Sequence, residues 1–188
     1  QVAGIHRTHH IETVVEPDLA RLTPRMVASL EEPVDPFGAG VYVVSEVARR
    51  HVTVALGGDG GDELFAGYEY LKGLEPASLP AELIDIMGRL HNTALQRVDR
   101  CASAHSTVAH VAFLDPEVVS LALQIPSEFK LQDGVEKWIL RRAMDGALPE
   151  SVLDRTKAKF WEGAGVGDLM AAHAVGQISD TDFERERI

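Results

Sequence analysis

The sequence predicts an α/β fold that is rich in helix, with a partial parallel sheet near its amino-terminal end and a helical region after it. The β-branched, apolar run 51–56 ("HVTVAL") predicts a buried strand. The spacing of apolar residues over 41–50 predicts the helix before it, while 11–16 and 17–30 predict an earlier strand and helix. Strand, helix and strand in this order are typical of a parallel α/β unit.

The rest of the chain is predicted to be nearly all helical. Residues 31–40 ("EEPVDPFGAG") are expected to form a turn-rich break, because prolines and glycines interrupt regular structure. The polar end from Ser179 has the pattern of a capped, solvated helix. Further helices are predicted over 80–97, 116–124, 135–144, 149–155 and 166–175. We therefore expect an α/β part over 1–72 and a helical part over 73–188.

Composition and charge exclude several classes of function. A formal net charge of −11 on 188 residues argues against nonspecific binding to nucleic acid and against docking on an anionic membrane. The single cysteine, Cys101, cannot form an internal disulfide, and its place in a helical stretch predicts a small buried side chain. No apolar run is long enough to cross a bilayer, so we expect a cytoplasmic protein.

The segment "LGGDGGDELF" (56–65) combines glycines with acids directly after a predicted strand, where open α/β sheets place ligands. Glycine amides can approach an anion closely, and a helix beginning near Asp62 would add its positive dipole end. Asp59, Asp62 and Glu63 would repel a bare phosphate but attract one that carries Mg²⁺, which prefers carboxylate oxygens. The pattern indicates a metal–pyrophosphate or metal–nucleotide site without a Walker lysine, or else a glycine-rich turn whose acids cap a helix.

Three segments in order resemble the synthetase domain of glutamine-dependent asparagine synthetases. "LGGDGGDELFAGY" (56–68) is similar to that family's "SGDGGDELFGGY"-type signature. "FLD" (113–115), followed by "IPSEFKL" and "EKWILRRAMDGALPESVLDR", and then "RTKAKFWEGAG" (155–165) are similar to its later motifs. The resemblance covers about 9–167. It implies a partial sheet of the adenine-nucleotide alpha-hydrolase-like, PP-loop ATP pyrophosphatase type.

The resemblance also implies a reaction and its residues. In that family ATP activates a carboxylate, such as that of aspartate, as an acyl-adenylate with release of Mg²⁺-pyrophosphate, and ammonia or an amine then attacks the acyl carbon. The family's pattern implies catalytic roles for Lys157 and Asp59, and Asp62 as the carboxylate for Mg²⁺ on pyrophosphate. The positions implied to bind ATP and pyrophosphate are Gly57, Gly58, Gly60 and Asp62. Gly57 stands where the family often has serine, so a hydroxyl contact is lost.

The segment "TVAHVAFLD" departs from the family's "V-E-x-R-x-P-F-L-D" pattern. Val108 replaces the acid, His110 the arginine and Ala112 the proline, so a charged pair near the acceptor site is lost. We interpret His110 as a structural histidine rather than a catalytic base. Asp115 is expected to cap the following helix rather than to bind a ligand.

No "SGGxDS" pyrophosphate loop and no glutaminase domain occur in these residues. The whole of 1–188 therefore resembles the carboxyl-terminal part of one incomplete synthetase domain, with 1–72 as its nucleotide-binding part, and we expect it to be inactive alone. The expected partners are a carboxylate, ATP and a partner chain or second copy that supplies the missing strand. Two alternatives stay open: a non-catalytic binding or scaffolding remnant, and a ring-forming ligase similar to β-lactam synthetases or lasso-peptide cyclases.

Overall fold

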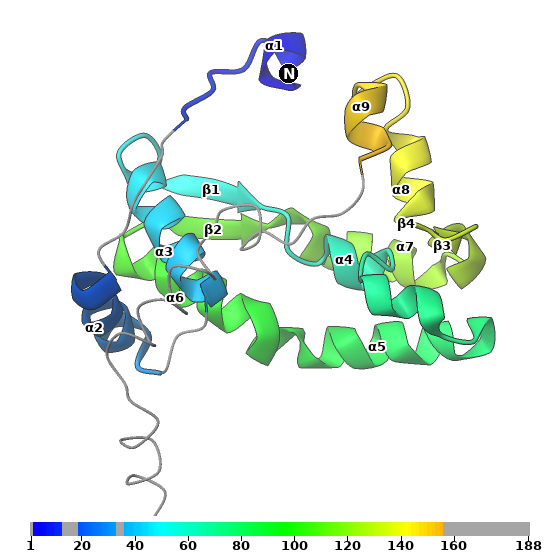
Figure 1. Cartoon of the computed structure of the whole chain (residues 1–188), viewed down its shortest axis with the longest axis horizontal. Coiled ribbons are helices and arrows are strands. Elements are labelled where there is room, and N and C mark those ends of the chain that lie inside the picture. Colours follow the sequence, from blue (N-terminus) through cyan, green and yellow to red (C-terminus); the bar gives the residue numbers. More distant parts are fainter. Residues whose placement is uncertain (1, 13–18, 33–35, 156–188) are drawn as a thin grey trace, which may run out of the picture. The chain divides into compact units, whose positions relative to one another are not determined.

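The computed structural model describes residues 2–12, 19–32 and 36–155, and within them the chain is rich in helix (Figure 1). Strands β1 (Val54–Gly57) and β2 (Val108–Val111) pair in a small sheet and run in the same direction. The predicted helix-rich class with a small parallel sheet is therefore confirmed. The predicted helix over 166–175, the tail from Ser179 and Lys157 lie outside the described residues.

The chain divides into two compact units. The first consists of Gln1–Glu12, Val54–Gln96 and Ala109–Lys157. The second consists of Thr13–Thr53, Arg97–Val108 and Ala158–Ile188. Consecutive helical segments lead from the first unit into the second: α5 (Leu79–Leu90), a π-helical turn η3 (His91–Leu95) and α6 (Gln96–Ala104). The helix predicted over 80–97 therefore continues to Ala104.

The second unit contains α2 (Leu19–Leu30), α3 (Pro36–Arg49) and most of α6. Its core is small and is made by residues of these three helices. The core residues are Met26, Leu30, Ala39, Tyr42 and Cys101. Cys101 is fully buried, as its place in a helix predicted.

Helix α3 begins earlier than predicted. Pro36 stands at its first position, where proline needs no N–H partner, so 36–40 is helical and its prediction as a turn is wrong. Gly38 and Gly40 are buried. The sulfur of Cys101 lies 3.7 Å from the carbonyl oxygen of Gly38. The two glycines are therefore buried inside a helix instead of breaking it.

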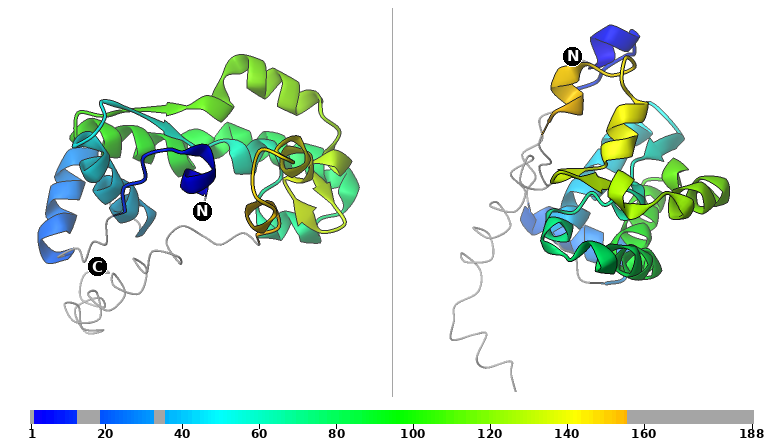
Figure 2. Two further views of the ribbon diagram at one scale, coloured as in Figure 1. Left: turned by 90° about the horizontal axis from the view of Figure 1, so that it is seen from above. Right: turned by 90° about the vertical axis from the view of Figure 1, so that its right-hand side faces the viewer.

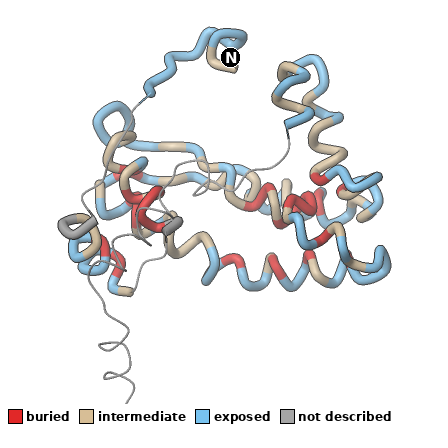
Figure 3. The backbone as a smooth tube through the Cα atoms, viewed as in Figure 1, coloured by how far each residue is buried: buried red, intermediate tan, exposed pale blue. Residues whose placement is uncertain are grey.

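The sheet of β1 and β2 differs from the prediction in two ways. The strand β2 was not predicted, and the side chains of β1 are not buried, since Val54 is 49% and Leu56 is 79% exposed (Figure 3). Within the described residues each strand has one neighbour, and both alternate exposed and half-buried positions. The apolar run therefore predicted correctly that β1 is a strand, but it did not predict that the side chains of β1 are exposed. Ile11 and Glu12, the described part of the strand predicted over 11–16, form no strand.

The core of the first unit has two clusters. In one, the apolar face of α5 packs against the residues that follow the glycine-rich segment. Its members are Ala66, Leu71, Leu79, Leu83 and Ile86. In the other, Leu64 and Phe65 pack with Ala122 of α7 (Pro116–Gln124).

Helix α7 has the bounds that were predicted, and Asp115 caps it. The Asp115 carboxylate accepts a hydrogen bond of 2.9 Å from the backbone N–H of Glu117, so the capping role is confirmed. His110, by contrast, is exposed on β2, so its side chain is not part of the core. Single 3₁₀ turns connect the elements of this unit: η1 (Glu69–Gly73), η2 (Pro76–Ser78), η4 (Ala112–Leu114) and η5 (Ser127–Phe129).

A hairpin precedes helix α8 and changes the prediction for 135–144. Strands β3 (Leu131–Gln132) and β4 (Val135–Glu136) pair antiparallel, with Leu131 opposite Glu136. The turn residues Asp133 and Gly134 both have positive φ, as an Asp-Gly turn between two strands requires. Helix α8 therefore begins only at Trp138 and ends at Ala143.

Helix α9 (Glu150–Leu153) lies within the range 149–155 that was predicted. The hairpin, α8 and α9 follow one another at one end of the first unit (Figure 2). A short helix α1 (Val2–His6) stands at the amino-terminal end of the described chain. None of the helices found in 2–12, 19–32 and 36–155 is both long enough and apolar enough to cross a membrane.

Candidate functional site

The glycine- and acid-rich turn follows the carboxyl end of β1, as predicted, and two of its glycines are needed for packing. Gly60 has φ of 94°, and a Cβ atom there would lie 2.5 Å from Cδ2 of Leu114. A Cβ at Gly61 would lie 3.3 Å from Cε2 of Phe113. The turn therefore packs directly on the "FLD" segment.

Gly57 and Gly58 have different surroundings. Gly58 is exposed, and within the described chain a Cβ added to it would meet no atom closer than 4 Å. At Gly57 a Cβ would lie 3.0 Å from Oδ2 of Asp59, whose side chain is half-buried. Gly58 is thus the loop position that a ligand could approach, whereas Gly60 is covered by Leu114. The nucleotide contacts expected of Gly57, Gly58, Gly60 and Asp59 remain predictions.

Helix α4 (Gly61–Leu64) is a single turn, shorter than the motif suggested. Its N-cap is Gly60, and among the described residues no side chain caps it. Asp62 and Glu63 both lie in its first turn, and the alternative in which the acids only cap this helix stays a prediction. A single turn also offers few free amides, so its contribution to anion binding is limited to its first N–H groups.

Asp62 forms an ion pair with Lys137, which we call the Asp62 pair. Asp62 Oδ1 and Lys137 Nζ are 2.8 Å apart, and the two side chains are 28% and 29% exposed. The backbone N–H of Lys137 donates to the carbonyl of Phe65 at 3.1 Å, which ties the start of α8 to the end of α4. Lys137 was not predicted as a site residue, although it lies in the "EKWILRR" segment on which the resemblance partly rests.

Gly67 is the residue that makes room for the Asp62 pair. A Cβ at this position would lie 1.9 Å from Asp62 Oδ1 and 2.5 Å from Lys137 Cε. The N–H of Gly67 also donates to the Asp62 carbonyl oxygen at 2.8 Å. The carboxylate and the ammonium therefore lie directly over this backbone, and only glycine allows the approach.

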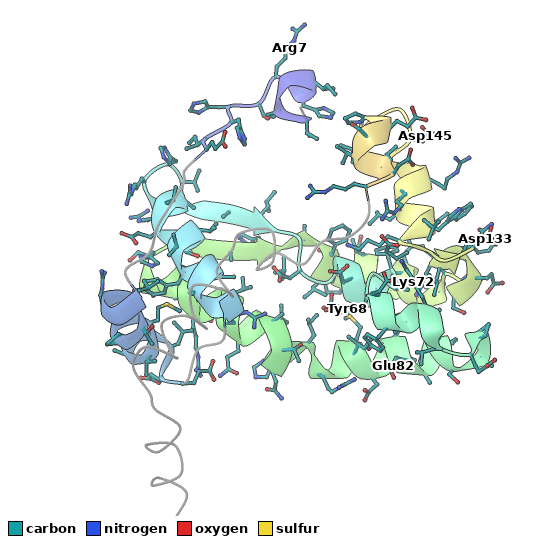
Figure 4. The ribbon with its side chains drawn as sticks, viewed as in Figure 1. Arg7, Tyr68, Lys72, Glu82, Asp133 and Asp145 are labelled. Carbon is teal, nitrogen blue, oxygen red and sulfur yellow. The ribbon has the colours of Figure 1, made fainter. Side chains whose placement is uncertain are left out.

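The neighbouring acid, Glu63, has a different role. Its side chain is buried, and its carboxylate accepts a hydrogen bond from the hydroxyl of Tyr68. Burial raises the pKa of Tyr68 well above its ordinary value, and the bond to Glu63 and the charge of Asp62 raise it further. Tyr68, labelled in Figure 4, is therefore a permanent donor to Glu63, and this bond fixes the chain between α4 and η1.

A second group of charges surrounds Glu136, the residue before Lys137, and we call it the Glu136 cluster. It consists of Glu136, Lys72, Glu69 and Arg141. Lys72 Nζ lies 3.2 Å from Glu136 Oε2 and 2.7 Å from Glu69 Oε2. Arg141 pairs with the other oxygen of Glu136, whose side chain is only 7% exposed.

The surroundings of Glu136 favour its charged form. Burial alone would raise the pKa of Glu136, but its own backbone N–H, Lys72 and Arg141 outweigh this effect and hold the pKa below the ordinary value. A buried carboxylate with two cationic partners is a stable structural anchor rather than a group that exchanges protons near neutral pH.

A cavity of about 850 Å³ lies beside the Glu136 cluster, between the hairpin, α8 and α9. Acidic and basic side chains both line it, together with the indole of Trp138, over which the Arg142 guanidinium lies at 5.9 Å. The charged lining residues are Lys72, Glu136, Arg141, Arg142, Asp145, Glu150, Asp154 and Arg155. Lys72 and Asp145 mark two parts of this lining in Figure 4.

The charged side chains of the described residues fit one kind of metal site. Throughout 2–12, 19–32 and 36–155 no three side chains of His, Cys, Asp or Glu come together as a metal site of their own. Mg²⁺ that arrives on a phosphate needs only one or two protein carboxylates, because phosphate oxygens and water supply the rest. Asp62, half-exposed beside an open glycine turn, fits this second kind of site.

Comparison with known proteins identifies the family. The family model described as asparagine synthase matches residues 1–85 and 76–187 of the chain. The chain belongs to the asparagine synthase family. The resemblance found in the three motifs is thereby confirmed, and it extends over nearly the whole sequence.

Individual members of the asparagine synthase family agree. The chain is 36% identical over 183 residues to an asparagine synthetase (glutamine-hydrolyzing) of Triphysaria versicolor, covering 92% of this chain and 29% of that protein. Asparagine synthetase (glutamine-hydrolyzing) 2 of Arabidopsis thaliana is 34% identical over 184 residues, with the same coverage of 92% and 29%. An asparagine synthetase (glutamine-hydrolyzing) of Sandersonia aurantiaca is 35% identical over 140 residues, which cover 69% of this chain and 27% of that protein. The chain thus spans less than a third of the length of these relatives.

Proposed function

We propose that this chain is part of an ATP-dependent ligase of the asparagine synthetase type. Such an enzyme activates the carboxylate of aspartate, or of a similar acid, and transfers the acyl group to ammonia or another amine. The observation that carries the proposal is the Asp62 pair. It places a carboxylate and an ammonium 2.8 Å apart, half-exposed, beside a glycine turn at the carboxyl end of β1. The proposed fold of the complete domain is the PP-loop ATP pyrophosphatase type.

The proposed reaction has two steps. A carboxylate oxygen of the substrate attacks the α-phosphorus of ATP, the bond from that phosphorus to the bridging oxygen breaks, and pyrophosphate leaves. The amine nitrogen then attacks the acyl carbon of the resulting acyl-adenylate, AMP leaves, and the nitrogen loses a proton. Negative charge develops on the phosphoryl oxygens in the first step and on the acyl oxygen in the second. The protein must therefore supply fixed positive groups at both places.

The residues of this chain divide these tasks. Asp62 would hold Mg²⁺ on the leaving pyrophosphate; when bound, that ion neutralises phosphate charge. Lys137, which balances Asp62 in the structure, supplies an ammonium at the same place for a phosphate oxygen. The open backbone at Gly58 allows a phosphate to approach its N–H.

Lys157 is proposed to stabilise the charge that develops during adenylation. This role comes from its position in the family's motif, because Lys157 lies outside the described residues. One fixed donor aimed at developing charge contributes roughly 3 kcal/mol to catalysis. Asp59 is proposed to orient the nucleotide from the turn between Gly58 and Gly60.

The test is exchange of pyrophosphate into ATP by the full-length protein that carries this chain. We expect exchange only when an acidic amino acid or a similar carboxylate is present, and loss of exchange in Lys157→Ala and Asp62→Asn. Lys159→Ala is the matched control for Lys157→Ala and should exchange normally. Normal exchange by Lys157→Ala would remove the role given to that lysine.

Two other outcomes correspond to the alternatives. Exchange that depends on a carboxylate carrying its own amine, with a cyclic product, would indicate a ring-forming ligase. Absence of exchange with every carboxylate tried, in a folded full-length protein, would indicate a binding or scaffolding protein.

A further inference from the structure

The chain between Asp62 and Tyr68 forms a turn that needs support from its neighbours. Helix α4 ends at Leu64, and the backbone then passes through Ala66, which is fully buried and has φ of 55°. This left-handed conformation is unfavourable for a residue that carries a Cβ atom. Such backbone persists only where the surrounding structure holds it in place. The turn therefore depends on contacts made by the residues at its two ends.

The hydroxyl of Tyr68 joins the two ends of this turn. It donates a hydrogen bond to the carboxylate of Glu63, which is buried and follows Asp62 directly in α4. The half-buried ring of Tyr68 packs on the core cluster that contains Ala66 and the apolar face of α5. The hydroxyl is thus held by the core, and the buried carboxylate has a strong need for its donor. Together they form a fixed link across the turn.

Gly67, the residue before Tyr68, lies against the Asp62 carboxylate. Its N–H donates to the Asp62 carbonyl oxygen at 2.8 Å. A Cβ atom on Gly67 would lie 1.9 Å from Asp62 Oδ1 and 2.5 Å from Lys137 Cε. At this close approach the path of the Gly67 backbone sets where the carboxylate and the ammonium can lie, so a shift of this backbone moves both charges.

We propose that Tyr68, through its bond to Glu63, is a positioning residue for Asp62. The bond holds Gly67 against the Asp62 carboxylate and so fixes the direction in which that carboxylate meets Mg²⁺. The inference rests on the proposed function, and in this role Tyr68 acts through Asp62 and not on the substrate itself.

The kinetic test is pyrophosphate exchange by the full-length protein over a range of free Mg²⁺ concentrations. In Tyr68→Phe, kcat should fall and the Mg²⁺ concentration for half-maximal exchange should rise, each about 10-fold, as is usual when the support of a metal ligand is lost. Tyr70→Phe is the matched control, because the Tyr70 hydroxyl donates to Glu82 at 2.7 Å and Tyr70 is 53% exposed. Both values should stay within about twofold in the control.

The Mg²⁺ dependence separates positioning from a general structural effect. A merely structural role would lower the fraction of active protein and leave the Mg²⁺ concentration for half-maximal exchange unchanged. The same Mg²⁺ dependence in Tyr68→Phe as in Tyr70→Phe would therefore overturn the proposal.

A double substitution separates the position of Asp62 from the stability of the turn. Tyr68→Phe alone leaves the buried Glu63 carboxylate without this donor, which is destabilising in itself. Tyr68→Phe combined with Glu63→Leu removes the bond without leaving a buried charge, so stability should recover at least in part. The altered Mg²⁺ dependence should remain. Recovery of the original Mg²⁺ dependence together with stability would overturn the positioning role.

Hydrogen–deuterium exchange gives a readout that does not depend on activity. The amide of Gly67, which is bonded to the Asp62 carbonyl, should lose protection in Tyr68→Phe but not in Tyr70→Phe, while α7 stays protected in both. If Tyr68→Phe does not fold, Glu63→Gln provides the same test. It keeps an acceptor oxygen but replaces a charge-assisted bond with a weaker neutral one, so protection should fall by a smaller amount. Unchanged protection of Gly67 in these folded variants would overturn the positioning role.

Failure of this proposal differs from failure of the proposed function. Normal exchange by Asp62→Asn would overturn both the metal role of Asp62 and a positioning role for Tyr68. Loss of exchange in Asp62→Asn together with normal kcat and normal Mg²⁺ dependence in Tyr68→Phe would overturn only the positioning role.

Discussion

Glu136 and Lys137 are adjacent in the sequence but belong to two charge clusters of opposite character. Glu136 is buried between two cations, with 7% of its side chain exposed. Among the described residues Lys137 meets one carboxylate, and both partners of the Asp62 pair are more than a quarter exposed. A buried acid with several partners stabilises structure, because its removal leaves uncompensated charges. A partly exposed pair contributes less to stability than a fully buried cluster, so its partners can be exchanged for a ligand more readily.

The backbone of Lys137 explains how neighbours reach different clusters. Glu136 ends the strand β4, and Lys137 follows with φ of 55°, in the left-handed region, as the N-cap of α8. The change from extended to left-handed backbone turns the second side chain away from the first. The comparison predicts that substitutions on the two sides differ in what they damage.

The largest effect on stability is expected from Glu136→Gln. Lys72 and Arg141 lose their buried anion, and breaking such a cluster costs about 3 to 5 kcal/mol. Denaturant unfolding monitored by circular dichroism measures the change. Glu69→Gln is the control, since Glu69 pairs with the same Lys72 but its side chain is 76% exposed. A similar loss in both variants would contradict the distinction between buried and exposed members of the cluster.

Gly67→Ala should have the next largest effect. The new methyl group would lie 1.9 Å from Asp62 Oδ1, so the Asp62 pair must separate and the backbone must shift. Overpacking of this kind costs about 1 to 3 kcal/mol, and pyrophosphate exchange should fall with it. At Gly73, where the described residues leave open space, the same substitution should change neither property. Wild-type exchange by Gly67→Ala would show that the Asp62 pair is dispensable.

A smaller effect on stability is expected from pH through the Glu136 cluster. Because the folded pKa of Glu136 lies below its ordinary value of 4.5, its stabilising contribution is complete above that value. The contribution is lost as the pH falls through the folded pKa. The difference in unfolding free energy between the unsubstituted protein and Glu136→Gln should therefore narrow below pH 4.5. A difference that stays constant down to the folded pKa would contradict the lowered pKa.

The smallest effect on stability should come from Asp62→Asn. Removing one charge from a pair whose side chains are both more than a quarter exposed should cost less than breaking the buried Glu136 cluster, on the order of 1 kcal/mol. The same substitution should abolish pyrophosphate exchange, because the proposed metal carboxylate is gone. The denaturant midpoint of Asp62→Asn, compared with that of Glu136→Gln, measures the difference in stability between the two clusters. A loss of stability as large as in Glu136→Gln would place Asp62 among the structural acids.

Helices and strands that depend mainly on neighbouring residues could be predicted from the sequence. The proline after Asp115 and the apolar spacing that follows gave α7 and its cap, and the β-branched run gave β1. The Asp133–Gly134 pair is a hairpin signal that the helical interpretation of 135–144 overlooked. Gly38 and Gly40 were misinterpreted because a glycine buried in a helix has the same sequence signature as one that makes a turn.

The charge clusters depend on long-range packing and could not be predicted from spacing. Asp62 was identified from its motif, but its partner Lys137 lies far along the chain, and nothing in either segment specifies the other. Gly67 was likewise unremarkable in the sequence, since its importance comes from the two side chains that pass over it. The exposure of β1 also depends on what surrounds it, which an apolar run does not encode.

The left-handed backbone at Lys137 makes the hairpin sensitive to length as well as to composition. One residue inserted between Glu136 and Lys137 would break the succession of extended and left-handed backbone, and both clusters would lose a partner at once. An insertion at Asp133–Gly134, two strand residues away, would leave both in place. Differences in chain length among proteins built this way should therefore collect at the tip of the hairpin and avoid its base.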